Sequence, residues 1–187
     1  GYLSPSAPGG VNSTFNEFTG GRGNDTITGN GGTRISYQGA LEGVSVDLTA
    51  GLAIGGTSVG TDTIIGGVNQ VRGSNSNDTL VGGLAVNNGF EGFEGRGGND
   101  LLSGGSGFDR ADYGFDGPVG VGITVNLAAG TVVGDPVLTG TDTLLSIEAI
   151  RGSFRADTYN AVGFSSSSTN AGSNGTFNEF EGMAGDD

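Results

Sequence analysis

The hydrophobic residues of this chain recur in short alternating runs that are separated by glycine-rich turns. The longest runs are GVSVDL at 43–48 and GITVNL at 122–127, in which every second residue is apolar. Alternation with a period of two predicts strands with one buried face. Elsewhere, single apolar residues follow Gly-Asp turns in the order x-U-x, where U is apolar, which predicts very short strands with one inward side chain each. The pattern therefore predicts an all-β protein with many turns.

The chain also repeats itself over a long period. Segments that begin at Phe15, Phe90 and Phe177 share the pattern F-x-x-F-x-G-x-x-G-x-D. Between them, GTDTI at 60–64 aligns with GTDTL at 140–144. We therefore expect an excerpt of a longer repetitive polypeptide. Its predicted parts are a lead-in or linker at 1–13, a first copy at 14–88, a second copy at 89–175 with an exposed Ser-rich loop at 164–175, and the start of a third copy at 176–187.

A nine-residue repeat lies inside the long one. Residues 20–28 and 104–112 fit G-G-x-G-x-D-x-U-x, and 95–103 departs from it at one position. Glycine permits positive φ and close backbone approach, while the aspartate supplies a carboxylate at a constant place. Turn, strand, turn and strand would close one coil of a flattened parallel solenoid. Its stacked turns would then form columns of carboxylate and carbonyl oxygens, the ligands that Ca²⁺ prefers.

The aspartates of these turns, with several turn glycines, are the predicted calcium ligands. They are Asp25, Asp62, Asp78, Asp100, Asp109, Asp142, Asp157 and Asp187, with Gly21, Gly23, Gly98, Gly105 and Gly107. If the two longest gaps between aspartates, which end at Asp62 and Asp142, each hold two coils, one coil takes about 20 residues. The coils near Gly43 and Gly122 would then lack an Asp turn.

Neighbouring turns of the column are expected to share an ion. The expected pairs are Asp62 with Asp78, Asp78 with Asp100, Asp142 with Asp157, and Asp157 with Asp187. Asp109 follows Asp100 by nine residues and so belongs to the opposite edge, where its candidate partners are Asp112, Glu91 and Glu94. The alternative for Asp78 and Asp157, whose turns lack the second glycines, is that the aspartate caps its turn by accepting nearby N–H groups.

Composition adds a charge problem and excludes several function classes. Glycine accounts for 41 of 187 residues, the net charge is -13, and seven arginines are the only positive side chains. The absence of His and Cys excludes a catalytic triad, a His-Cys zinc site and a disulfide, and neither H-E-x-x-H nor G-x-S-x-G occurs, so we expect no enzyme. An acidic chain without a basic patch predicts no nucleic-acid partner, and no apolar run approaches the ~18 residues of a membrane span.

Two further repeated features have simple interpretations. The Phe pairs 15/18, 90/93 and 177/180 are predicted to be core or edge-covering aromatics. Arg72 and Arg151 occupy equivalent positions of the two copies and are predicted to form surface salt bridges.

The nonapeptides, together with the longer unit from Tyr37 or Tyr113 through GTDT to RGS, resemble the RTX (repeats-in-toxin, hemolysin-type) calcium-binding repeats of large secreted bacterial proteins. The resemblance covers nearly the whole chain from about Phe15. It implies a parallel β-roll or β-solenoid with calcium-binding Gly-Asp turns and several Ca²⁺ ions. It also implies type I secretion and folding outside the cell, with the chain largely unfolded before it meets calcium.

The expected function is a calcium-stabilised structural segment of an extracellular or cell-surface bacterial protein, as a stalk, matrix component or filament. Its expected partners are calcium and further copies of itself, stacked end to end or laterally, with no nucleic acid and no membrane insertion. The alternatives are an adhesin repeat module and the C-terminal secretion or folding region of an RTX exoenzyme or toxin.

Overall fold

The structure, a computed structural model, describes residues 2–3, 15–83, 89–114 and 120–187. Apart from Tyr2–Leu3, the lead-in expected at 1–13 lies outside the described residues. The strands in the described part of the chain are β1 (Tyr2–Leu3), β2 (Asn16–Thr19), β3 (Thr26–Ser36), β4 (Ser45–Asp47), β5 (Leu52–Ile54), β6 (Thr61–Arg72), β7 (Thr79–Val81), β8 (Phe90–Glu94), β9 (Leu101–Ser103), β10 (Phe108–Asp112), β11 (Thr124–Asn126), β12 (Thr131–Val133), β13 (Thr141–Leu145), β14 (Ala149–Arg151), β15 (Thr158–Asn160) and β16 (Glu179–Glu181).

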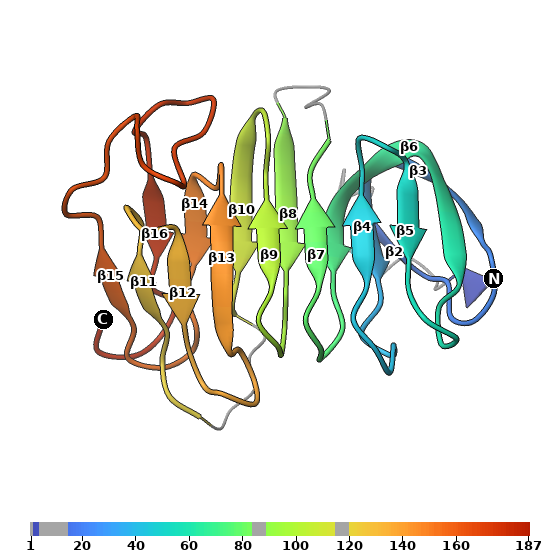
Figure 1. Cartoon of the computed structure of the whole chain (residues 1–187), viewed down its shortest axis with the longest axis horizontal. Helices are drawn as coiled ribbons and strands as arrows, with labels where there is room; N and C mark the ends of the chain where they lie inside the picture. Colours follow the sequence, from blue (N-terminus) through green and yellow to red (C-terminus); the bar gives the residue numbers. More distant parts are fainter. Residues whose placement is uncertain (1, 4–14, 84–88, 115–119) are drawn as a thin grey trace.

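All of these strands belong to one mixed sheet, so the parallel β-roll or β-solenoid expected from the sequence is wrong. Thirteen strands form a continuous hydrogen-bonded path in the order β15-β11-β12-β13-β9-β7-β4-β5-β6-β8-β10-β14-β16, and β1, β2 and β3 attach beside β6. Neighbours such as β7 and β9 run parallel, whereas β4-β5-β6 and β11-β12-β13 are antiparallel. Figure 1 shows this succession along the long axis of the molecule.

The antiparallel pairs replace the coils that were expected to lack an Asp turn. After β4 the chain reverses through a turn in which Asp47 Oδ1 accepts the Ala50 N–H at 2.8 Å and Gly51 adopts a φ of 67°. The second copy makes the same turn with Asn126 and Gly130. Because the side chain of Asp or Asn stabilises a tight reversal, the next strand folds back along β4 or β11 and does not start another coil.

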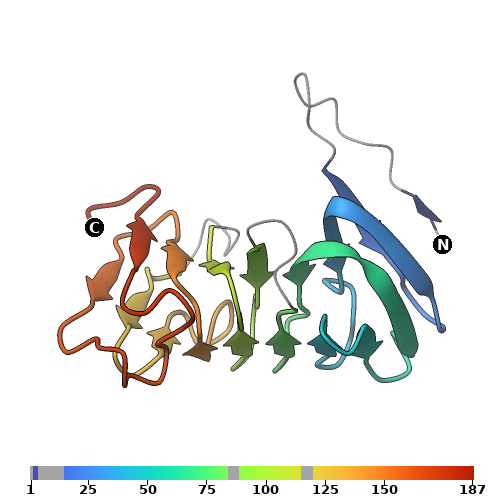
Figure 2. The ribbon, with the colours of Figure 1, turned by 90° about the horizontal axis from the view of Figure 1, so that it is seen from above.

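The path doubles back on itself at β6 and nearly closes into a barrel. The first residues of β6 pair with β5, and its last residues pair with β8, so this strand joins two facing rows (Figure 2). At the far end, β15 and β16 approach each other through stacked rings of Tyr159 and Phe180, whose centroids lie 4.9 Å apart. Within the described residues, these two strands do not pair.

The core lies between the two rows of strands and is built from the alternating positions. Val46, Leu80, Leu102, Val125 and Leu144 are all fully buried. Most of them face one another in register across neighbouring strands, as Leu80, Leu102 and Leu144 do. The apolar runs at 43–48 and 122–127 therefore do bury one face, as their alternation predicts.

The second member of each Phe pair lies in or against the core, which confirms the core part of their prediction. Phe93 is fully buried, and Phe18 and Phe180 pack against the core cluster. Phe15 and Phe177 are 37% and 53% exposed, and Phe90 is half-buried.

The Ser-rich segment 164–175 is mostly exposed, with one buried contact. The Asn170 side chain is 1% exposed, where it accepts the N–H of Ile147 at 2.9 Å and donates to its carbonyl oxygen at 2.8 Å. The loop is therefore held against the edge of the sheet beside Glu148.

Candidate functional site

The aspartates that end the turns stack along one edge of the sheet. We call Asp25, Asp62, Asp78, Asp100, Asp142, Asp157 and Asp187 the first turn row. Within it, the backbone N–H of one aspartate donates to the Oδ1 carboxylate oxygen of its neighbour. These bonds link Asp25 to Asp62, Asp78 to Asp100, Asp100 to Asp142 and Asp157 to Asp187, at donor–acceptor distances of 2.8–2.9 Å. The first turn row is therefore a ladder in which the backbone N–H of one aspartate is hydrogen-bonded to the carboxylate of the next.

The two hairpins interrupt this ladder and decide which aspartates are neighbours. Of the expected ion-sharing pairs, Asp78 with Asp100 and Asp157 with Asp187 are adjacent, whereas Asp62 with Asp78 and Asp142 with Asp157 are not. At both interruptions a hairpin N–H occupies the ladder position. Val44 donates to Asp78 Oδ1 at 2.7 Å, and Ile123 donates to Asp157 Oδ1 at 2.8 Å.

Asp62, Asp142, Asp78 and Asp157 of the first turn row each accept two or more hydrogen bonds from the chain itself. Asp62 and Asp142 accept on Oδ1 from an aspartate N–H and on Oδ2 from a tyrosine hydroxyl, Tyr37 and Tyr113 respectively, each at 3.0 Å. Asp78 and Asp157 accept from serines of their own turns. The tyrosine partners were not anticipated, although Tyr37 and Tyr113 do begin the repeated unit.

A second group of carboxylates belongs to the other row of strands. Asp109 on β10 lies in register with Glu91 on β8, and its N–H donates to Glu148 Oε2 at 2.9 Å. Glu91, Asp109 and Glu148 are only 6%, 0% and 3% exposed. We call these three residues the inward acid row. Asn69, one position before the registered pair Gln70 and Gly92, extends it onto β6.

The inward acid row resolves the partner of Asp109. Of the three candidates from the sequence, Glu91 lies beside it, whereas Asp112 and Glu94 form ion pairs with arginines elsewhere. Glu148 was missed, because it lies outside the nonapeptides and its counterpart in the first copy is Asn69. Three carboxylates in register on adjacent strands repel one another, so this arrangement requires a compensating positive charge or proton.

Burial and like charge both disfavour ionisation of the inward acid row. Burial, followed by the negative charges of Glu148 and Glu91, raises the pKa of Asp109 to about 8, while the Glu91 backbone acts in the opposite direction. Burial also raises the pKa of the Glu91 and Glu148 carboxyls. Within the described residues, neither oxygen of Asp109 lies in hydrogen-bond geometry with a donor, and Oε1 of Glu148 has none either.

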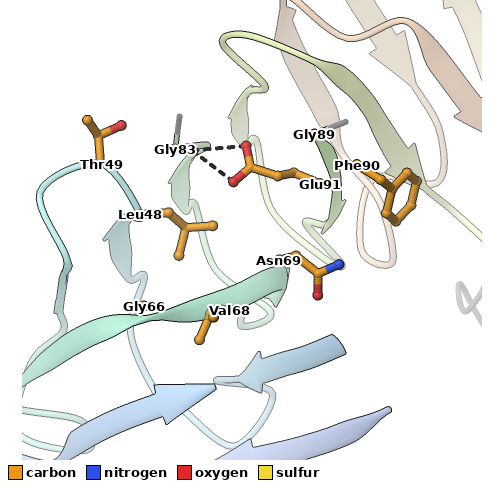
Figure 3. Close-up of a pocket in the computed structure, with 10 residues that line it drawn as sticks. Leu48, Thr49, Gly66, Val68, Asn69, Gly83, Gly89, Phe90 and Glu91 are labelled. Atoms are coloured by element: carbon orange, nitrogen blue, oxygen red, sulfur yellow. Dashed lines mark hydrogen bonds between the residues drawn. The ribbon is translucent and has the colours of Figure 1, made fainter. Parts of the chain in front are cut away.

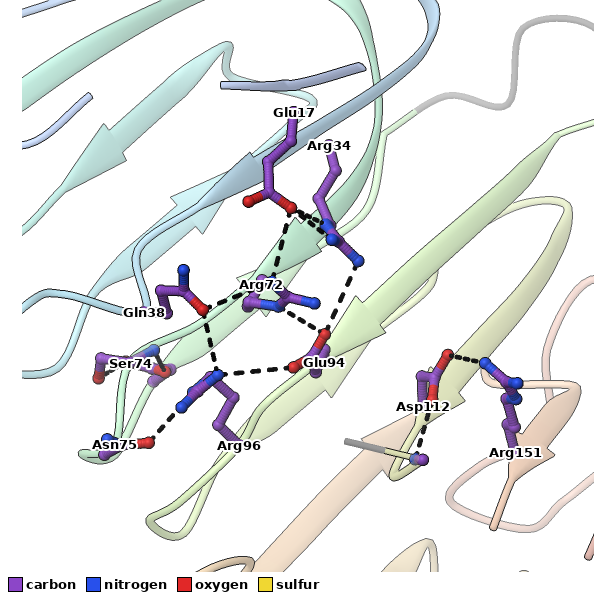
Figure 4. A network of polar contacts seen from close by, with 12 residues as sticks. Glu17, Arg34, Gln38, Arg72, Ser74, Asn75, Glu94, Arg96, Asp112 and Arg151 are labelled. Carbon is purple, nitrogen blue, oxygen red and sulfur yellow. Dashed lines mark hydrogen bonds and ion pairs between the residues drawn. The ribbon is translucent and has the colours of Figure 1, made fainter. Parts of the chain in front are cut away.

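The arginines of the chain neutralise other carboxylates. Arg72, which is 8% exposed, binds Glu94 Oε2 at 2.7 Å and Glu17 at 3.5 Å, and Arg34 and Arg96 join the same network (Figure 4). Arg72 therefore forms a buried ion pair with Glu94, and not the surface salt bridge that was expected. Arg151, 3.4 Å from Asp112 and 3.6 Å from Glu181, is the counterpart in the second copy. Among the described residues, no ion pair includes the inward acid row.

A pocket of about 210 Å³ reaches one end of the inward acid row (Figure 3). Leu48, Val68 and Phe90 contribute apolar walls, and Asn69 and Glu91 contribute oxygen atoms. Both carboxylate oxygens of Glu91 accept the Gly83 N–H, at 3.0 and 2.9 Å. The Asn69 Oδ1 atom is buried without a hydrogen-bond donor. An amide and a carboxylate group thus line this end of the pocket.

The inward acid row offers the type of ligand that calcium prefers, but its side chains are not arranged as a formed site. Calcium takes six to eight oxygen ligands from carboxylates, amides and backbone carbonyls. In the described ranges, no group of three acidic side chains is arranged to hold a metal ion. Asp109 Oδ2 and the Ser146 carbonyl oxygen both lie close to Gly104, where they would clash with any Cβ.

Several carboxylates of the first turn row already accept hydrogen bonds from the chain. Asp25 Oδ2 is buried without a donor, whereas Asp62, Asp78 and Asp157 already hold donors on both oxygens. The predicted glycine ligands, Gly21, Gly23, Gly98, Gly105 and Gly107, all adopt positive φ between 76° and 126°. Glycine is favoured at such positions because a residue with a Cβ is strained in this backbone conformation.

The buried acids make the metal-free protein sensitive to pH. In chelator, we expect the free energy of unfolding to fall by about 4 kcal/mol between pH 5 and pH 8.5. The folded state retains protons on Asp109 and its glutamate neighbours that the unfolded chain releases above about pH 4, so raising the pH favours unfolding. Urea titrations at a series of pH values measure this slope. A stability that rises with pH over this range would contradict the assignment.

Comparison with known proteins gives no relative: no family model matches the sequence, and no curated protein matches it. In the ranges that the structure describes, there is no helix of the length and apolar character needed to cross a membrane.

Proposed function

We propose that this chain is a calcium-stabilised structural segment of a secreted or cell-surface bacterial protein. The observation that carries the proposal is the Asp109 carboxylate, which is fully buried between Glu91 and Glu148 and has no donor in hydrogen-bond geometry among the described residues. A buried charge without a partner is strongly destabilising, so a fold that contains one needs a cation or a proton there. Five of the seven arginines pair with other carboxylates, and no ion pair among the described residues includes Asp109, so we propose that an external cation supplies the positive charge.

In this proposal the inward acid row and the glycine-rich turns hold the ions. Asp109, Glu148 and Glu91 bind at one edge of the sheet, with backbone carbonyls such as that of Ser146. Asp25, Asp100 and Asp187 contribute at the other edge, where their turns stack on neighbouring turns. Bound Ca²⁺ neutralises the carboxylates. Backbone carbonyls supply further oxygen ligands, and the turn glycines allow the backbone to position them.

The proposal places the segment outside the cell, where calcium is abundant. Weak extracellular calcium modules bind at ~10⁻⁴–10⁻³ M, so a chain of net charge -13 would gain most of its stability at millimolar calcium. Binding energy then becomes folding energy, because the ligand set exists only in the folded chain. This mechanism agrees with the secretion route that the RTX resemblance implies, and it assigns no catalytic role.

The continuity of the strands between the two copies supports a role in building length. β7 of the first copy pairs with β4 of its own copy and with β9 of the second copy. Repeat arrays are built by such nearest-neighbour contacts. We therefore propose a stalk, matrix or filament component that contacts further copies of itself.

Calcium titration of the 187-residue chain tests the proposal directly. We expect the melting temperature to rise by about 10 °C between excess chelator and 10 mM calcium, because each saturated site adds about 1.4 kcal/mol per tenfold excess over Kd. Circular dichroism measures the transition, and sodium chloride at the same ionic strength controls for screening of the net charge. Equal melting temperatures in chelator, calcium and sodium chloride would overturn the proposal.

A further inference from the structure

Six-residue turns that begin with glycine and end with aspartate fall into two conformational classes. In the first class, positions 2 and 4 of the turn both adopt positive φ. These pairs are Gly21 (76°) with Gly23 (111°), Arg96 (75°) with Gly98 (122°), Gly105 (87°) with Gly107 (126°), and Met183 (67°) with Gly185 (131°). We call these the left-handed turns. Arg96 and Met183 adopt this conformation although they carry a Cβ, so the surrounding structure imposes it.

The second class consists of 73–78 and 152–157, one in each copy, which we call the serine turns. Position 2 is Ser74 or Ser153, and neither it nor position 4 has a positive φ. Both serines are buried, at 0% and 2% exposure. The sequence GSNSND at 73–78 differs from the consensus G-G-x-G-x-D only at positions 2 and 4.

Each serine turn is closed by its own hydrogen bonds. The Ser74 N–H donates to Asp78 Oδ2 at 2.6 Å, and its hydroxyl donates to Asp78 Oδ1 at 2.8 Å. The same hydroxyl oxygen accepts the N–H of Ser76 at 3.0 Å. With the Val44 N–H added, the Asp78 carboxylate accepts three hydrogen bonds from the chain.

The second copy repeats the arrangement closely. Ser153 donates to Asp157 through its N–H at 2.7 Å and its hydroxyl at 2.6 Å, and its hydroxyl oxygen accepts the Arg155 N–H at 3.0 Å. The Ile123 N–H supplies the third bond, as Val44 does in the first copy. An ionised carboxylate has about four acceptor positions, so three hydrogen bonds occupy most of them. Hydrogen bonds to a charged carboxylate are also stronger than those between neutral groups.

We infer that the serine turns take no cation and that Ser74 and Ser153 determine which Asp turns of this chain bind calcium. In a serine turn, the hydroxyl and the turn N–H groups occupy the carboxylate oxygens that an ion would need. In a left-handed turn, positive φ at positions 2 and 4 removes this donor set, which leaves oxygens such as Asp25 Oδ2 and both oxygens of Asp109 without donors. The part of this inference that concerns calcium binding rests on the proposed function. The part that concerns the hydrogen bonds within the serine turns does not.

The test converts a serine turn into a left-handed turn. The double substitution Ser74→Gly with Ser76→Gly makes residues 73–78 match G-G-x-G-x-D, and isothermal titration calorimetry should show one more bound calcium than in the wild type. Ser74→Ala with Ser76→Ala is the matched control and should add none. The Asp78→Asn variant should leave the calcium number of the wild type unchanged. If the glycine variant fails to fold, Ser153→Gly with Arg155→Gly tests the same step in the second copy.

A loss of one calcium in Asp78→Asn, or no added calcium in either glycine variant, would overturn the inference. The closure itself is measured in chelator, where Ser74→Ala should lower the melting temperature by about 5 °C because buried carboxylate oxygens lose a donor. If the wild type binds no calcium, the proposed function fails, and the chelator measurement alone decides this inference. An unchanged melting temperature in Ser74→Ala would then refute it.

Discussion

The Asp109→Asn variant should be more stable than the wild type in chelator and less stable than the wild type in calcium. Without metal, the wild type must either bury a negative charge between Glu91 and Glu148 or hold a proton on a carboxyl whose pKa is raised to about 8. Asparagine removes this cost, because it is neutral at every pH. With calcium, the same substitution removes a charged group that we propose as a ligand in the inward acid row. The same substitution should thus raise the free energy of unfolding in chelator and lower it in calcium.

We expect a gain of about 1–2 kcal/mol in chelator at pH 8.5 and a loss of about 2–3 kcal/mol in calcium. Urea denaturation in the two buffers measures both. Asp47→Asn is the matched control, because the second copy already has Asn126 at the equivalent turn position, and it should change neither value by more than about 0.5 kcal/mol. If Asp109→Asn destabilises equally in both buffers, Asp109 is a structural acid and calcium does not bind it.

The local features that the sequence predicts well are those in which one residue decides the geometry. Turn glycines at 21, 23, 98, 105 and 107 do adopt positive φ, because other residues are strained there. Period-two runs such as 43–48 do bury one face. The spacing of Asp78 and Asp100 does bring them together, because each short strand between turns pairs with the next one in parallel.

The arrangement of the sheet was not predicted, because it depends on the direction in which a turn sends the chain. The turn after Asp47 contains Thr49, Ala50 and Gly51, which fit a solenoid corner as well as a hairpin. The structure shows a hairpin, and two antiparallel strands consequently separate Asp62 from Asp78. The mixed sheet follows from this single choice, made once in each copy.

The inward acid row was only half visible in the sequence. Asp109 lies in a nonapeptide, but Glu148 lies outside both nonapeptides, before Ala149 and Ile150. It reaches Asp109 only because β14 pairs with β10, a contact between segments about 40 residues apart along the chain. Its position in the long repeat was a usable signal, because Glu148 lies three residues before Arg151, as Asn69 lies three residues before Arg72.

The Leu102→Ala variant should lose about 3 kcal/mol of unfolding free energy in calcium and in chelator alike. Leu102 is fully buried in the middle of the sheet and lies in register with Leu80 and Leu144. Truncation removes apolar burial and leaves a cavity between strands that cannot close independently, which typically costs 2–5 kcal/mol. The melting temperature should fall by about 6–12 °C.

The matched control is Leu41→Ala, the same truncation at a side chain that is 78% exposed, which should cost less than about 0.5 kcal/mol. The comparison separates apolar packing between the rows, which acts under every condition, from the stabilisation by calcium that we propose for buried carboxylates without donors. A Leu102→Ala loss that appears in calcium and vanishes in chelator would mean that the core assembles only after the ions bind. In that case the serine turns and the packing of Leu80, Leu102 and Leu144 would not be sufficient to keep the sheet folded without calcium.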